Sequence, residues 1–442
     1  MLLPAPRKAG SLPLSTEPPY KPGYGLEPPL LVGRDRLLAW TWEALVSGPT
    51  HPDFHQALLG ERGVGKTVVA QLIASRTKAQ LGWAVLDYHA IAGEASLPAL
   101  VHELPGALGA WSRRGREFRQ LEKQLSVGVN IGVLSASTTL RSTKEGLAVT
   151  TAFGSLVRDV GRYARSHETG LLVTIDEAHV LERQPDLAAL SRSMQTIVKE
   201  RLPIAVLLVG LPPLRERFNG AGTFIQRLQT RQIGDLSPES ARLALVEPAA
   251  RVGVHFEPEA LDALVDRSNG RPYHVQLFGY HAWRAADGAT EITRAHVEAG
   301  LQEAYVQLDG EFEPTWRALR PQDRDYLVAL SEIGPYEAST EAVAHKLGRA
   351  QRQLSMVRDR LVNEHGVLHA PARGVVQFSV QQFGDWVGQR HGRSTSARDS
   401  SLSNLLEASF PTGNEPGEPP KHPDARTRRP GLSDEHEKGF GR

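Results

Sequence analysis

Short apolar runs alternate with amphipathic segments through the first half of the chain. The apolar runs are residues 54–59, 83–88, 171–175, 204–209 and 232–233. Runs of this length, bounded by polar and turn residues, are typical of strands buried on both faces of a parallel sheet. The segments between them carry apolar residues at helical spacing and include residues 68–74, 97–124, 151–166 and 187–199. This alternation predicts an α/β fold, a doubly wound parallel sheet over residues 30–236.

One segment departs from this alternation. Residues 125–139 are small, polar and β-branched, and they alternate with a period of roughly two, which favours a hairpin or an extended excursion. We therefore assign an insertion of unknown role to about residues 102–145, between the second and third predicted strands.

From residue 237 onward the pattern indicates helices alone. Predicted helices begin near Ser237, Glu257, Gly270 and Thr293, and proline stands in the first turn of the first three. These helices predict a small bundle, a helical lid, over residues 237–309. Further on, the predicted elements are helices at 323–330, 339–344 and 349–363 and strands at 366–369 and 375–379. Three helices followed by a hairpin is the order of a winged helix, which we assign to residues 312–388.

The two ends of the chain lack such patterns. Residues 1–29 are rich in proline and predict a disordered or extended N-terminus. Residues 392–442 are polar, rich in proline and glycine and nearly free of core-forming side chains, so they predict a disordered tail.

Composition excludes several classes of protein. The 51 basic and 50 acidic residues nearly cancel, so any nucleic-acid surface must be a local patch. The absence of cysteine removes disulfides, thiol catalysis and thiolate metal sites, and it fits the cytoplasmic location that we expect. No apolar run approaches the roughly 18 residues that span a bilayer, so we expect no membrane partner.

The first strong chemical signal lies between the first predicted strand and helix. It reads G-x-x-x-x-G-K-T, the phosphate-binding loop pattern, and comprises Gly60, Glu61, Arg62, Gly63, Val64, Gly65, Lys66 and Thr67. The glycines allow successive N–H groups to face one phosphate, and Lys66 reaches the β- and γ-phosphates. The Thr67 hydroxyl suits Mg²⁺, and the following helix directs its positive end at the same anion. The pattern predicts an ATP site with Mg²⁺.

A second signal follows the strand at 171–175. Asp176 and Glu177 stand where parallel sheets bind ligands, at the carboxyl end of a strand. Asp176 would hold Mg²⁺ through its water shell, and Glu177 would polarise the water that attacks the γ-phosphate. The alternative is an ordinary helix start, where acidic residues are favoured. His179 completes the sequence Asp-Glu-Ala-His, which we interpret as an exposed or capping histidine because no second helicase-type domain follows.

These motifs together carry a family resemblance. The chain resembles the AAA+ superfamily of P-loop ATPases, above all the origin-recognition-like and archaeal-type ATPases, in which a helical lid and a winged helix follow the core. The resemblance covers about residues 30–280 and extends to about 388 with the winged helix. It rests on residues 32–35, 60–67, 176–177 and 270–272.

The resemblance implies further roles in the site. Val32 and Gly33 would lie near the adenine, and Arg271 at the start of a lid helix would sense the γ-phosphate. The alternative for Arg271 is a solvated residue at a helix N-terminus. Arg227, with Arg231 nearby, would be an arginine finger contributed to a neighbour's ATP, which implies a homo-oligomer; the alternative is a solvated basic helix end. One departure matters: Gly210 and Leu211 follow the strand at 204–209, where many relatives carry a polar sensor residue. We therefore expect slow hydrolysis.

The predicted winged helix carries several arginines. Arg349, Arg352, Arg358 and Arg360 lie on its third helix, and Arg373 lies at the tip of the wing. Such a surface suits DNA, since arginines contact phosphates while the helix reads base edges. Residues 349–374 are therefore the predicted DNA surface, although winged helices also serve protein contacts.

Three functions follow from this organisation. The first is an ATPase switch that binds and slowly hydrolyses ATP and binds DNA through its winged helix. The second is a signalling ATPase of the STAND type, whose C-terminal part binds a protein partner. A helicase or translocating motor is the third, and the missing second motor domain disfavours it.

Overall fold

The computed structural model describes residues 17–23, 25–91, 93, 96–109, 111, 143–181, 184–212, 214, 228–334 and 337–391. The predicted hairpin at 125–139, most of the assigned insertion and the predicted tail at 392–442 lie outside the described residues.

A five-stranded parallel sheet forms the centre of the core, in the order β2-β3-β4-β1-β5. Its strands are β1 (Gln56–Leu59), β2 (Ala84–His89), β3 (Leu171–Asp176), β4 (Ile204–Gly210) and β5 (Gln229–Gln232). This confirms the predicted parallel α/β fold. β4 pairs with both β1 and β3, so it separates the strand before the phosphate loop from the strand before the acidic pair. All five carboxyl ends lie at one edge of the sheet because every pairing is parallel.

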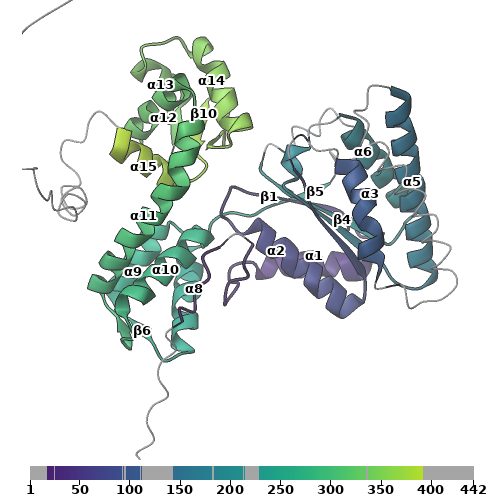
Figure 1. The fold of residues 1–442 in the computed structure, drawn as a ribbon, viewed down its shortest axis with the longest axis horizontal. Coiled ribbons are helices and arrows are strands. Elements are labelled where there is room, and N and C mark those ends of the chain that lie inside the picture. The colour runs from purple at the N-terminus through teal and green to yellow at the C-terminus, as the bar shows by residue number, and fades with distance from the viewer. Residues whose placement is uncertain are drawn as a thin grey trace, which may run out of the picture. The chain divides into compact units, whose positions relative to one another are not determined.

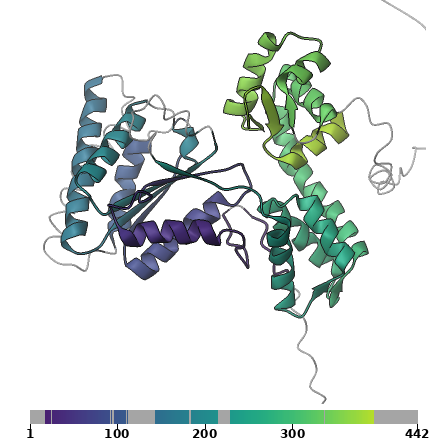
Figure 2. The ribbon, with the colours of Figure 1, turned by 180° about the vertical axis from the view of Figure 1, so that it is seen from behind.

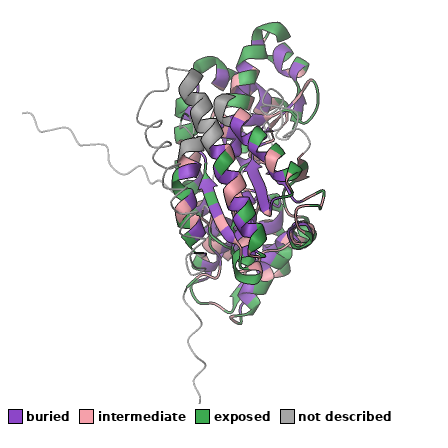
Figure 3. Cartoon of the chain, turned by 90° about the vertical axis from the view of Figure 1, so that its right-hand side faces the viewer, coloured by how far each residue is buried: buried purple, intermediate pink, exposed green. Residues whose placement is uncertain are grey.

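Helices cover both faces of this sheet (Figures 1 and 2). The helices are α1 (Asp35–Ser47), α2 (Lys66–Arg76), α3 (Ser96–Ala107), α5 (Thr143–Ser166) and α6 (Gln184–Lys199). Successive strand residues point to opposite faces, and the buried side chains follow that rule. Leu58 packs in one cluster with Ile73 of α2, whereas Leu59 packs in another with Leu156 of α5. Figure 3 shows the buried strands between helices whose outer residues are exposed.

The region after the sheet is helical, as predicted. It contains α8 (Pro238–Ala250), α9 (Pro258–Ser268), α10 (Pro272–Ala286) and α11 (Arg294–Ala318), with the short paired strands β6 (His255–Phe256) and β7 (Glu291–Ile292). The Ser237 hydroxyl accepts a hydrogen bond from the Ser240 backbone N–H at 3.2 Å, which caps α8. α11 ends at Ala318 rather than near residue 308. Phe312 packs against the buried clusters on both sides of that point, which accounts for the continued helix.

The C-terminal region combines helices with a small antiparallel sheet. Its helices are α12 (Pro321–Ile333), α13 (Thr340–Lys346), a continuous helical stretch over residues 351–364 that includes α14 (Ser355–Asp359), and α15 (Gln381–His391). Its strands are β8 (Glu337–Ser339), β9 (Leu368–His369) and β10 (Val375–Phe378), in the order β8-β10-β9. The predicted hairpin strands are present as β9 and β10. The sequence reading missed β8 and α15.

The N-terminal segment before α1 contains no helix or strand among its described residues, 17–23 and 25–34. Tyr20, which lies within the segment predicted to be disordered or extended, is nevertheless buried among the lid residues. Its hydroxyl donates to the Leu245 carbonyl oxygen at 2.7 Å. The Lys21 N–H donates to Oε1 of Gln276 at 3.1 Å. In the part of the chain that the structure describes, no helix has the length and apolar character needed to cross a membrane.

Candidate functional site

The phosphate loop joins β1 to α2 at the carboxyl edge of the sheet. Gly63 and Gly65 have φ values of 79° and 86°, a left-handed backbone that side chains disfavour. An ideal Cβ on Gly60 would lie only 2.2 Å from the Ile233 carbonyl oxygen. The Gly60 N–H also donates to the Gly210 carbonyl oxygen at 3.2 Å, which ties the loop to β4. The glycines of the motif are therefore required by backbone shape and by close approach.

Lys66 begins α2 and is buried beneath this loop. Its Nζ donates to the Glu61 carbonyl oxygen at 2.8 Å, so the ammonium points back into the loop. Burial lowers the pKa of Lys66, and the nearby carboxylates of Glu177 and Asp176 oppose that shift. A bound phosphate would supply a stronger acceptor than the carbonyl and would favour the charged lysine.

Thr67 and Asp176 meet across the sheet edge. The Thr67 hydroxyl donates to Oδ2 of Asp176 at 2.7 Å, although the two residues come from α2 and the end of β3. The second carboxylate oxygen, Oδ1, accepts the Glu177 N–H at 2.8 Å. A hydroxyl and a carboxylate in contact are the hard oxygen ligands that Mg²⁺ prefers, so these residues fit the predicted metal role.

Glu177 follows directly and lines the same cavity as Lys66 and Thr67. Its φ of 52° and ψ of 30° are left-handed, which is unusual for a residue other than glycine. Such outliers cluster at functional sites, where surrounding contacts hold them. The structure thus brings together four of the residues that the sequence predicted: Lys66, Thr67, Asp176 and Glu177.

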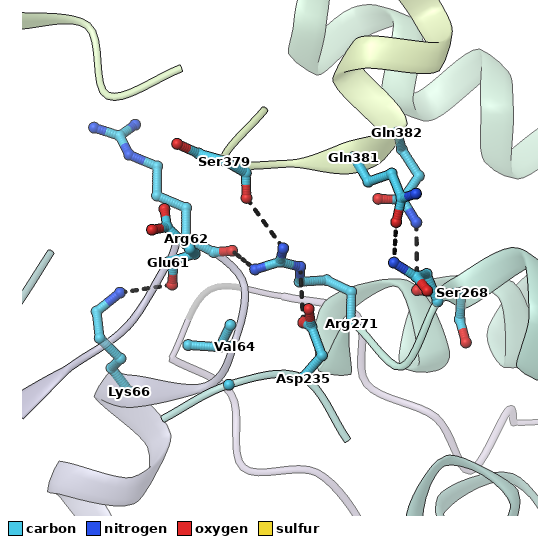
Figure 4. Close-up of polar contacts among 12 residues, drawn as sticks. Glu61, Arg62, Val64, Lys66, Asp235, Ser268, Arg271, Ser379, Gln381 and Gln382 are labelled. Carbon is cyan, nitrogen blue, oxygen red and sulfur yellow. Dashed lines mark hydrogen bonds and ion pairs between the residues drawn. The ribbon is translucent and has the colours of Figure 1, made fainter. Parts of the chain in front are cut away.

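Arg271 connects this loop to the lid and to the C-terminal region (Figure 4). It is the residue before α10, and its side chain is almost fully buried. One guanidinium nitrogen donates to the Arg62 carbonyl oxygen at 2.8 Å, and another donates to the Ser379 carbonyl oxygen at 3.0 Å. The third, Nε, lies 3.0 Å from Oδ1 of Asp235. Burial raises the pKa of Asp235, while the charges of Arg271 and Arg34 oppose the shift.

The sequence reading missed Arg34, which is buried beside the loop. Its NH2 donates to the Val64 carbonyl oxygen at 3.1 Å and to the Gly234 carbonyl oxygen at 2.6 Å. Burial lowers its pKa, and Asp235 opposes that shift. Asp235 was missed as well. The turn at residues 32–35 was noticed, but the burial of its arginine cannot be predicted from the residue type alone.

A cavity of about 430 Å³ opens at this site. Its walls come from the phosphate loop, the N-terminal segment, the start of α10 and the C-terminal region. The predicted residues Val32, Lys66, Thr67, Glu177 and Arg271 all line it, and the structure places Gly33 beside the lining residue Val32. This volume lies within the range of about 300–1,000 Å³ that small-molecule sites occupy.

Of the two arginines considered for the finger, the structure describes only Arg231. Arg227 lies outside the described residues. Arg231, on β5, forms an ion pair with Asp53, and its guanidinium lies 4.7 Å from the centre of the Trp40 ring. Both contacts hold Arg231 within its own chain.

The predicted DNA surface is only partly exposed. Arg349, Arg352 and Arg373 are exposed, and Arg358 is half-buried. Arg360 does not belong to this surface, because its guanidinium pairs with the fully buried carboxylate of Asp323. The sequence pattern placed the four arginines other than Arg373 on one helix but could not show that Arg360 points inward.

Family models match two parts of the chain. Residues 55–218 match a family described as an AAA domain. Residues 309–387 match a domain of unknown function, DUF8462. With the parallel sheet, the phosphate loop and the acidic pair in place, the core is that of a P-loop nucleotide-binding protein. The match at residues 55–218 and the likeness in fold both agree with the predicted fold of the AAA+ P-loop ATPases.

Several solved structures resemble the chain. A Walker-type ATPase of Pyrococcus abyssi has a TM-score of 0.55 at 14% identity, with 81% of this chain and 96% of that chain covered. The ORC1 protein of Aeropyrum pernix, in complex with DNA, has a TM-score of 0.44 at 18% identity, with 87% and 97% covered. The RuvB Holliday junction branch migration motor of Thermotoga maritima has 0.39 at 17%, with 78% and 92% covered. The first likeness shows the fold. No curated protein matches the chain.

Proposed function

We propose that this protein binds ATP with Mg²⁺ and hydrolyses it slowly to ADP and phosphate, as a molecular switch. The observation that carries the proposal is the meeting of Lys66, Thr67, Asp176 and Glu177 at one edge of the sheet, where Lys66, Thr67 and Glu177 line a cavity of suitable size. Thr67 and Asp176 would hold Mg²⁺, which when bound neutralises phosphate charge. Lys66 binds the β- and γ-phosphates, and the Glu177 carboxylate orients and polarises the attacking water.

The switch itself would act through Arg271. Its guanidinium directs three of its five N–H groups at the phosphate loop, Asp235 and Ser379, and a γ-phosphate would be a stronger acceptor than the Ser379 carbonyl oxygen. Binding of ATP would therefore compete with the contact to Ser379. Release of that contact would free the C-terminal region from the phosphate loop. The conformation of the C-terminal region would then depend on whether ATP is bound.

DNA is the proposed partner of the C-terminal region. The order of its helices and strands agrees with a winged helix, and three of the five predicted arginines are exposed. A protein partner is the second candidate, in a switch of the STAND type. It is favoured by Met356, which is 74% exposed on the same helical stretch as Arg352, because large exposed apolar side chains suit protein contacts better than phosphates.

Two substitutions test the ATPase proposal. Lys66→Ala should abolish binding of a fluorescent ATP analogue, because the buried ammonium is the main cation of the loop. Glu177→Gln should retain that binding but lower the rate of phosphate release by about 10²- to 10⁴-fold, the range for a lost general base. Arg242→Ala, which removes an exposed pair with Asp262 on the lid, is the matched control. Normal turnover by Glu177→Gln would show that the base has been wrongly assigned.

A further inference from the structure

His179 is buried and lies beside Glu177, whereas the sequence predicted an exposed or capping histidine. The left-handed backbone of Glu177 starts a tight helical turn, Ala178–Val180, in which the Val180 N–H donates to the Glu177 carbonyl oxygen at 2.9 Å. This turn folds the chain back on itself. It places Nδ1 of His179 3.1 Å from Oε2 of Glu177.

The two side chains differ in their access to solvent. The His179 side chain is 10% exposed, whereas that of Glu177 is 33% exposed. Glu177 lines the cavity and His179 does not belong to its lining. The histidine therefore contacts the Glu177 carboxylate without lining the cavity itself. From there it can hold the carboxylate without touching a ligand in the cavity.

Gly210 explains how the histidine fits there. An ideal Cβ on Gly210 would lie 3.2 Å from the His179 backbone nitrogen and 3.5 Å from the His179 Cβ. It would also lie 3.3 Å from Cδ2 of Leu214. A side chain at position 210 would therefore crowd the turn that carries His179. The absence of a side chain at Gly210, the end of β4, therefore leaves room for the buried histidine beside the acidic pair.

We infer that His179 is the positioning residue for Glu177. It replaces the polar sensor side chain that is missing at the end of β4. This inference rests on the proposed ATPase activity. The close approach of Nδ1 to Oε2, at 3.1 Å, holds the carboxylate in one orientation. Oε1 is then presented to the attacking water. His179 itself touches neither nucleotide nor water.

Steady-state ATP hydrolysis by the full chain tests the inference. His179→Ala should lower kcat by about 10- to 100-fold, the loss expected when a reacting group is misplaced by about 1 Å, with KM and ATP-analogue binding nearly unchanged. His179→Asn should restore much of kcat, because the Asn amide nitrogen takes a position similar to Nδ1. His102→Ala, the same change at an exposed position on α3, is the matched control.

A double-mutant cycle separates positioning from a structural role. If His179 acts only through the Glu177 carboxylate, His179→Ala should change kcat little in the Glu177→Gln background. An equal loss in both backgrounds, or a wild-type kcat for His179→Ala, would overturn the inference. A loss of ATP-analogue binding in both His179 variants would do the same, since it indicates a structural role. Absence of hydrolysis by the wild-type chain would instead reject the proposed function.

Discussion

The core and the C-terminal region use charged side chains in opposite ways. Around the phosphate loop of the core, Lys66, Arg34 and the lid residue Arg271 are buried, and backbone carbonyl oxygens hold their cationic groups in place. In the C-terminal region, Arg349, Arg352 and Arg373 extend into solvent. A fixed set of cations suits a small anion of constant shape, whereas exposed cations suit an extended polyanion or a partner with variable contours. The difference supports the proposals of a small ligand at the phosphate loop and a large partner at the C-terminal region.

The largest expected effect is on the free energy of unfolding, and it tests whether the core tolerates an unpaired charge. His55, at the start of β1, is buried, and neither ring nitrogen has a hydrogen-bond partner among the described residues. Burial lowers the pKa of His55 to about 4. The unfolded chain, with a pKa near the ordinary value of about 6.5, binds this proton first as pH falls, so stability is lost between about pH 6.5 and pH 4.

His55→Leu should remove this part of the acid sensitivity. Urea unfolding at pH 7 and pH 5 should show that the variant loses about 2 kcal/mol less than the wild type between those values. His102→Leu, at an exposed site, should leave the difference unchanged. Equal acid sensitivity of His55→Leu and the wild type would mean that the core tolerates the charged ring.

The second prediction concerns the contact that joins the two regions. In the wild type, ATP should speed amide hydrogen exchange in residues 379–391, because the Arg271 guanidinium is drawn from the Ser379 carbonyl towards phosphate. Arg271→Ala should exchange about 10-fold faster in this segment without ATP, the scale of one lost charge-assisted hydrogen bond, and ATP should add little. Arg242→Ala again serves as the control. A variant that still responds to ATP as the wild type does would place the coupling elsewhere.

The smallest effect is expected on the exposed arginines. Arg352→Ala and Arg373→Ala should each weaken binding of duplex DNA to the full chain by about 1 kcal/mol and reduce the salt slope by about 1. Arg317→Ala, which removes an exposed pair with Glu313 on α11, should not. Fluorescence anisotropy over a salt series measures both quantities. No binding at low salt, or binding without salt dependence, would favour a protein partner at this surface.

The same contrast explains what could be predicted from the sequence. The loop at 60–67 and the pair Asp176–Glu177 were found because their chemistry depends on local order: strand, glycine turn, helix, and strand followed by carboxylates. The parallel sheet was found from apolar runs of strand length. Arg271 was found by resemblance, but its contact with Ser379 was not. That contact joins residues that are distant in the sequence, and nothing in the local pattern of either one indicates it.

Other differences between the sequence predictions and the structure also arise from contacts between residues that are distant in the sequence. Arg360 was assigned to the DNA surface because helical spacing alone cannot show that Asp323 is buried opposite it. β8 was missed because its three residues, Glu337–Ser339, form a strand only through pairing with β10. Arg231 was considered as a possible finger, and its pairing with Asp53 depends on the fold of β5 beside β1. In all three cases the prediction depended on a partner that lies far away in the sequence.

The contact between Arg271 and Ser379 also has a thermodynamic consequence that works in both directions. If ATP breaks it and thereby makes the C-terminal region easier to engage, then any ligand of that region that breaks it must tighten ATP binding by the same factor. DNA or a protein bound at residues 349–374 would thus raise the ATP affinity of the same nucleotide site that controls access to residues 349–374. Measuring ATP affinity with and without such a ligand would therefore report the strength of a coupling that neither site reveals alone.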